Sequence, residues 1–214
     1  MAKQLFLPAD VSNLHSKNKN VTSFFHLNSQ SLRNKEDEVF TFLKSLKFSF
    51  DVIMITETWY RDDEEVLTLD DHNTFSQHRV NKKGGGVMLM LNKSFNGCVI
   101  PRFSMVVNDY EILSYRCGSD VFSVVYRPPG GNVSSFLLFL DDFLSWITDN
   151  GLNLILGGDI NIDSLTSSHE QRELNMVLDC NGFRNVILEP TRMHTGSSID
   201  VLSPMFSVHS HNLV

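Results

Sequence analysis

The most informative segment of this 214-residue chain is 153–163, which is Asn-Leu-Ile-Leu-Gly-Gly-Asp-Ile-Asn-Ile-Asp. Together with Leu152, its apolar residues form a short, nearly continuous run that is typical of a strand buried on both faces. The run stops at Gly157–Gly158, and Asp159 and Asn161 follow directly. The segment therefore predicts a buried strand with polar side chains at its carboxyl end.

Asp159 and Asn161 are two positions apart, so they point to the same side if the strand conformation continues for one more step. A carboxylate can bind a hard cation or accept a proton, and a carboxamide can donate to a phosphoryl oxygen without repelling it. The pair therefore suits a phosphate or divalent-cation site. The alternative is a plain turn that leaves the core, because Gly, Asp and Asn favour turns for backbone reasons. Taken alone, the segment fits the turn better.

The composition is that of an ordinary globular chain, with 42% hydrophobic and 20% charged residues. Residues 1–20 are polar and irregular, so we expect a flexible leader followed by a single domain over 21–214. The longest apolar runs, such as 136–140, are too short to span a membrane. The three cysteines are scattered, which indicates reduced thiols of an intracellular protein, not a disulfide framework or zinc site.

The net charge of −7 argues against a general nucleic-acid binder that acts by neutralising phosphates, because such proteins carry an excess of Lys and Arg. It does not exclude an enzyme that acts on phosphodiesters through a metal ion, since the cation reverses the local field. The acidic run 62–65 fits a solvated face better than a metal site.

Two strands are expected in the first part of the chain, and both end in polar side chains. Segment 21–27 predicts a strand that ends at Asn28, and 51–58 predicts a buried strand that ends at Glu57. Between them, apolar residues recur at helical spacing, with Asn34 as the candidate N-cap. This strand–helix–strand order predicts a parallel crossover unit. Asn28 and Glu57 should then lie at the same edge of neighbouring strands.

The middle of the chain predicts only strands. The glycine triplet 84–86 resembles a phosphate-binding loop superficially, but it leads into the apolar strand 87–91 and lacks the Lys-Ser/Thr ending of such loops. A turn or a close backbone approach is the better interpretation. Segments 111–117 and 121–126 predict a hairpin that ends at Tyr126.

The last part of the chain predicts two amphipathic helices and a strand. Ser134 or Ser135 is the candidate N-cap of the first helix, and the second covers 168–180. His169, near the start of the second helix, is better explained as a surface residue than as a metal ligand. The strand that follows carries Asp200.

Five expected strand ends thus carry polar groups, and side chains that meet from separate strand ends are a common way to build an active site. Seven short motifs follow one another along the chain: Leu27-Asn28-Ser29-Gln30-Ser31-Leu32, Ile55-Thr56-Glu57-Thr58-Trp59, Gly84-Gly85-Gly86-Val87, Tyr126-Arg127-Pro128-Pro129, Gly158-Asp159-Ile160-Asn161, Pro190-Thr191-Arg192 and Ser198-Ile199-Asp200. Their order resembles the endonuclease/exonuclease/phosphatase superfamily. More narrowly, it is similar to the endonuclease domain of non-LTR (LINE-type) retrotransposons, over about 21–202.

The resemblance implies a four-layer α/β sandwich, in which two β-sheets pack face to face with helices outside. It implies hydrolysis of a DNA phosphodiester that depends on Mg²⁺, with Mn²⁺ as a possible substitute. Its biological role would be to nick target DNA so that reverse transcription can be primed. The partners implied are DNA and a reverse transcriptase domain in the parent polyprotein, and an active enzyme would then work in the nucleus.

The resemblance also implies roles for single residues. Glu57 and Asn28 would hold the metal, and Tyr126 would donate to a phosphate oxygen. Asp159 would orient or deprotonate the attacking water or serve the leaving group, with Asn161 stabilising the charge on the phosphoryl group.

Two further implied residues lie near the end of the chain. Thr191 would contact phosphate, and Asp200 would orient a catalytic histidine. The family's histidine comes from a Ser-Asp-His motif, which this sequence lacks, and His209 and His211 follow Asp200 too closely to replace it. We therefore expect a C-terminally truncated domain that lacks its last strand and is impaired in catalysis.

Two alternatives remain at this point. One is a catalytically silent retrotransposon remnant that binds metal or nucleic acid without cutting. The other is an inositol phosphate phosphatase of the same superfamily, which would need more basic residues around the site than a net charge of −7 readily provides.

Overall fold

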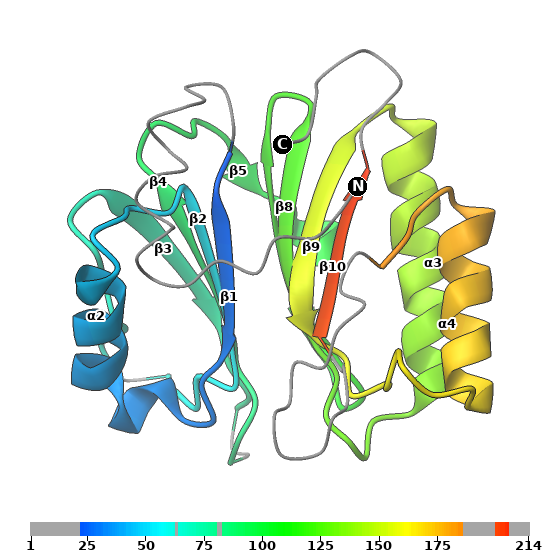
Figure 1. Ribbon diagram of the computed structural model, residues 1–214, viewed down its shortest axis with the longest axis horizontal. Coiled ribbons are helices and arrows are strands. Elements are labelled where there is room, and N and C mark those ends of the chain that lie inside the picture. The colour runs from blue at the N-terminus through cyan, green and yellow to red at the C-terminus, as the bar shows by residue number, and fades with distance from the viewer. Residues whose placement is uncertain (1–21, 63, 81–82, 186–199, 206–214) are drawn as a thin grey trace.

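Two β-sheets pack against each other in the computed structural model, which describes residues 22–62, 64–80, 83–185 and 200–205 (Figure 1). For residues 200–205 it describes the backbone only. Three parts of the prediction lie outside the described residues: the leader 1–20, Thr191 and the C-terminal region after Met205.

The first sheet has the strand order β1-β2-β4-β3. Its strands are β1 (Phe24–Asn28), β2 (Val52–Thr56), β3 (His72–Gln77) and β4 (Val87–Asn92). β1 and β2 are parallel, as the crossover prediction requires, and helix α2 (Glu36–Ser45) connects them. Val39 and Leu43 of α2 pack on Ile53 and Ile55 of β2, so this helix covers the outer face of the sheet.

The second sheet has the strand order β10-β9-β8-β7-β5, with β6 paired to β7. Its strands are β5 (Cys98–Val99), β6 (Met105–Val106), β7 (Glu111–Cys117), β8 (Asp120–Tyr126), β9 (Asn153–Asp159) and β10 (Asp200–Met205). The hairpin β7–β8 confirms the prediction, and β8 runs parallel to β9. Helices α3 (Val133–Asp149) and α4 (His169–Cys180) cover the outer face.

The core between the sheets follows from the period-two alternation of the strands. Val52 and Met54 of β2 face the second sheet, whereas their neighbours in sequence face α2. Phe122 and Val124 of β8 meet them from the opposite side. The order of layers is therefore helix, sheet, sheet, helix, which confirms the four-layer sandwich.

The strand at the centre of the motif has Asp159 at its carboxyl end, as predicted. β9 runs through Gly157 and Gly158 to Asp159, parallel to β8. A Cβ atom at Gly158 would lie 1.8 Å from the carbonyl oxygen of Val125. The glycine is needed because the neighbouring strand approaches closely, so it does not mark the end of the strand.

Two predicted helix caps are wrong by a few residues. Asn34 lies in a short 3₁₀ turn, and α2 begins at Glu36 with three acidic residues in its first turn that interact favourably with the helix dipole. Helix α3 is capped by Asn132, whose side chain accepts from the backbone N–H of Ser135 at 2.9 Å. Asn132 can take this role because asparagine is as good an N-cap residue as serine.

The predicted surface position of His169 is confirmed. Ser168 caps α4, and His169 is exposed and pairs with Glu173 one turn later at 3.2 Å. In the acidic run, Asp62 contacts His78 and Glu64 pairs with Arg33. No helix among the described residues has the length and apolar character needed to cross a bilayer.

Candidate active site

The carboxyl ends of the parallel pairs β1–β2 and β8–β9 meet at one edge of the sandwich. Here the Asn28 amide nitrogen donates to Glu57 Oε1 at 2.8 Å and to Asp159 Oδ2 at 2.6 Å. Asn28 and Glu57 come from the first sheet, and Asp159 comes from the second. One amide thus joins side chains that are up to 131 positions apart in sequence. The predicted approach of these residues is confirmed.

Asp159 is almost fully buried, with 1% of its surface exposed. Its second oxygen, Oδ1, accepts the backbone N–H of Asn161 at 3.0 Å. Asn161 has a φ of 50°, so the strand conformation does not continue and the expected same-side arrangement is wrong. The Asn161 side-chain amide instead donates to the Arg127 carbonyl at 2.8 Å. The tight turn after β9 fixes Asp159 through the backbone of Asn161.

Glu57 follows β2 in a strained turn. Its φ is 56°, and that of Trp59 is 60°, values that cost roughly 1–3 kcal/mol each for residues other than glycine. The backbone of Gly85 and Gly86 holds the turn, because their carbonyls accept the N–H groups of Trp59 at 2.9 Å and Thr58 at 3.3 Å. A Cβ at Gly86 would lie 2.2 Å from Thr58 Oγ1, so the triplet is a close backbone approach, as predicted.

Tyr126 ends β8 and is 5% exposed. Burial raises the pKa of its hydroxyl above the ordinary value, and the negative charges of Glu57 and Asp159 raise it further. The phenol therefore stays protonated at neutral pH and can act as a hydrogen-bond donor beside the two carboxylates.

The structure adds a buried ion pair that the sequence analysis missed. Glu111 is fully buried, pairs with the guanidinium of Arg79 and accepts the backbone N–H of Gly86 at 2.5 Å. Burial raises the pKa of the Glu111 carboxyl, although the Arg79 charge and the Gly86 bond oppose this shift. Glu111 lies opposite Tyr126 in the β7–β8 ladder, and the Arg79 guanidinium lies 5.9 Å from the Tyr126 ring centroid.

A signal for Glu111 was present in the sequence. Leu113 and Tyr115 follow it at alternate positions and face the core between the sheets. The same alternation places Glu111 on that buried face, where a carboxylate needs a partner. Its partner Arg79 could not be identified from spacing, because the two are 32 positions apart.

Arg127 has a structural role in the loops around the site. Its buried guanidinium donates to the carbonyls of Ile160 at 2.6 Å, Gly131 at 2.7 Å and Asn161 at 2.7 Å. These bonds tie the turn after β9 to the end of β8. Asp200 pairs with Asp159 through the backbone in the antiparallel β10–β9 ladder, while its side chain is outside the description.

The chemistry of Asn28, Glu57 and Asp159 fits a hard divalent cation. Two carboxylates held on one amide offer oxygen ligands, and Mg²⁺ is usually bound by one or two carboxylates together with water and phosphate oxygens. In the described part of the chain, no group of three or more His, Cys, Asp or Glu side chains could enclose a metal ion. A cation held by these few side chains would complete its coordination with water and phosphate oxygens.

Comparisons with known proteins agree with this fold. Residues 14–209 match the model of the Endonuclease/Exonuclease/phosphatase family. No curated protein matches the chain. Several solved structures share its fold at low sequence identity.

Four of these structures come from three nucleases. An AP endonuclease from Archaeoglobus fulgidus is 14% identical with a TM-score of 0.62, covering 86% of this chain and 86% of that chain. The endonuclease domain of TRAS1, a telomere-specific non-LTR retrotransposon, is 15% identical with a TM-score of 0.62, covering 84% and 82%. The 3′-5′ exonuclease NExo from Neisseria meningitidis is 16% identical with a TM-score of 0.66, covering 85% and 86%. A structure of NExo, as a 3′ phosphatase bound to product DNA hairpin, is 14% identical with a TM-score of 0.62 and covers 86% of each chain.

Proposed function

Because this chain belongs to the Endonuclease/Exonuclease/phosphatase family, we propose that it hydrolyses DNA phosphodiester bonds within a strand with the help of Mg²⁺. Mn²⁺ is the natural substitute, since it also favours oxygen ligands. The observation that carries the proposal is the Asn28 amide between Glu57 and Asp159 at the junction of the two sheets. The similarity in fold to the TRAS1 domain supports nicking of target DNA for retrotransposition, with a reverse transcriptase domain in the same polyprotein and action in the nucleus.

In this proposal Glu57 and Asn28 would hold the cation, which when bound would supply positive charge beside the phosphate that water attacks. Asp159 accepts hydrogen bonds from Asn28 and Asn161, which orient its carboxylate to direct or deprotonate that water. Tyr126 donates from its protonated hydroxyl to a phosphate oxygen. Asn161 would contact the phosphate only after its amide leaves the Arg127 carbonyl.

Plasmid nicking tests this proposal. The parent protein should convert supercoiled to open-circular DNA in Mg²⁺ but not in EDTA, and Glu57→Ala should abolish the conversion in Mg²⁺. Glu173→Ala is the matched control, because that carboxylate lies on the surface of α4 beside His169. Nicking by Glu57→Ala at the parent rate would contradict the proposal.

A catalytically silent retrotransposon remnant, which binds metal or nucleic acid without cutting, is the second candidate. Members of a catalytic unit act together, so a copy that has lost one catalytic group forfeits most of the rate. Titration with Mn²⁺, followed by its electron paramagnetic resonance signal, separates the candidates. Metal binding that depends on Glu57, without nicking of the plasmid, would identify the remnant.

A further inference from the structure

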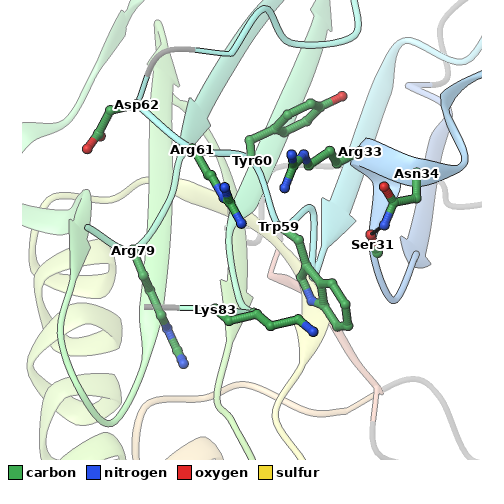
Figure 2. Close-up of a pocket in the computed structure, with 10 residues that line it drawn as sticks. Ser31, Arg33, Asn34, Trp59, Tyr60, Arg61, Asp62, Arg79 and Lys83 are labelled. Carbon is green, nitrogen blue, oxygen red and sulfur yellow. Dashed lines mark hydrogen bonds between the residues drawn. The ribbon is translucent and has the colours of Figure 1, made fainter. Parts of the chain in front are cut away.

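A polar cavity of about 610 Å³ is lined by residues close in sequence to Glu57, and Figure 2 shows the side chains around it. Its lining includes four cationic side chains and one indole, from Arg33, Arg61, Arg79, Lys83 and Trp59. Arg33 pairs with Glu64 and Arg79 pairs with Glu111, so the local excess of positive charge comes from Arg61 and Lys83, which have no carboxylate partner among the described residues. Such an excess favours an anionic ligand.

The cavity adjoins the site through the backbone and through Arg79. Trp59 follows Glu57 by two residues, and the N–H of Ser31, another lining residue, donates to the Glu57 carbonyl at 2.8 Å. Arg79 lines the cavity and also lies over the Tyr126 ring. A strand whose phosphate sits at Glu57 and Tyr126 would therefore extend its neighbouring nucleotide into the cavity.

Several donors around the cavity have no partner among the described residues. The buried indole nitrogen of Trp59 and the buried Nη2 of Arg79 make no hydrogen bond there. The guanidinium of Arg61 is exposed and is not engaged by any described carboxylate, whereas Arg33 pairs with Glu64. The one acidic lining residue, Asp62, accepts from His78 at 2.7 Å. Unused donors remain available for a ligand rather than for the fold.

Trp59 has a left-handed backbone conformation that is rare for a bulky aromatic residue. A bulky aromatic residue with a φ of 60° is an outlier, and such strain gathers at ligand sites. Figure 2 shows the indole standing next to Lys83, whose Nζ lies 5.7 Å from its ring centroid. An aromatic face beside a cation is the combination that binds an unpaired base together with its phosphate.

We infer that this cavity binds a nucleotide of the DNA strand next to the phosphate that is cleaved. The base stacks on Trp59, and the phosphate contacts Arg61 and Lys83. Stacking needs an unpaired base, so the strand has to be single-stranded or locally opened at this nucleotide. The inference rests on the proposed function, because it takes DNA as the substrate.

Tryptophan fluorescence tests the inference without requiring any cleavage. The chain has two tryptophans, and the second, Trp146 on helix α3, packs on Phe103. In Trp146→Phe, the emission reports Trp59 alone. Titration with a short single-stranded oligothymidylate in EDTA should quench this emission, and Trp59→Leu should lower the oligonucleotide affinity by about tenfold or more. A parallel titration of Trp59→Phe should show no quenching of Trp146.

The charge contacts are tested by the salt dependence of the same binding. Each lost phosphate contact should reduce the slope of log affinity against log salt by about 0.7 for single strands. Arg61→Ala and Lys83→Ala should each show this reduction. Arg102→Ala is the matched control. Arg102 is exposed and pairs with Asp142 of α3, and it does not line the cavity, so its loss should leave the slope unchanged.

An unchanged slope in Arg61→Ala and Lys83→Ala, or quenching that persists in Trp59→Phe, would overturn the inference. If plasmid nicking still depends on Glu57 in that case, the proposed function stands and only the nucleotide site is wrong. If the parent protein neither binds the oligonucleotide nor nicks, both ideas fail.

Discussion

Asn28 places one amide group between two carboxylates that would otherwise repel each other. We expect Asn28→Asp to remove both hydrogen bonds and add a third negative charge. In EDTA the variant should lose roughly 1–3 kcal/mol of unfolding free energy, the range for leaving partly buried polar groups unpaired. Mg²⁺ should restore more of this loss in the variant than it adds to the parent protein, because the cation offsets the added charge.

Urea unfolding with and without Mg²⁺ measures this difference. Asn73→Asp is the control, since Asn73 is exposed on β3 and the same substitution there should have little effect in either buffer. Equal losses at both positions would show that the Asn28 amide does not hold the carboxylates together.

Glu111 and Arg79 form a pair that is almost removed from solvent, with side-chain exposures of 0% and 10%. Glu111→Ala leaves the guanidinium and the Gly86 N–H without their acceptor, so we expect a loss of about 3–5 kcal/mol. Asp142→Ala breaks the exposed pair with Arg102 and should change stability by no more than about 1 kcal/mol. Chemical denaturation of the two variants compares the pairs, and similar small losses would contradict the structural role of Glu111.

The contact between β8 and β9 depends on Gly158. In Gly158→Ala the added methyl group would overlap the Val125 carbonyl, so the strands must separate or shift. We expect a loss of about 1–3 kcal/mol from overpacking, together with slower nicking because Asp159 is the next residue. Thermal unfolding and plasmid nicking check both effects. Gly130→Ala is the control, because a Cβ there meets nothing within 4 Å, and a comparable loss in that variant would contradict the argument.

The elements also show what a sequence can and cannot predict. The sequence predicts a common edge for four polar side chains, because parallel strands end together and their order along the chain determines which residues lie there. These side chains are Asn28, Glu57, Tyr126 and Asp159. The sequence does not predict the orientation of the Asn161 side chain, because this depends on a left-handed backbone angle after β9 that a strand pattern does not contain. The pairing of Arg79 with Glu111 likewise depends on how the two sheets dock.

The molecule as a whole should lose stability at alkaline pH. Burial raises the pKa values of Tyr60, Tyr110 and Tyr126, with further increases from Glu36, Asp109 and Glu57 respectively. An unfolded tyrosine releases its proton near pH 10, so above about that pH the unfolded state holds fewer protons than the folded state. Stability that is fully present below about pH 10 is therefore lost as the pH rises toward the folded pKa values.

Urea unfolding midpoints across this range, with an ultraviolet titration of the phenols, measure the effect. Tyr60→Phe and Tyr126→Phe should each weaken the decline, because each removes one shifted group. A midpoint that stays constant above pH 10, or a titration in which these phenols ionise at the ordinary value, would contradict the expectation.

The junction bridged by Asn28 has a further consequence for the proposed activity. Since Glu57 and Asp159 belong to different sheets, their separation is set by the core between the sheets, which includes Met54 and Phe122. A change in this core, such as the loss of a methyl group or the oxidation of a methionine, would shift the two carboxylates relative to each other. The activity would then fall although the protein remains folded. An inactivating change in this protein need not touch its substrate.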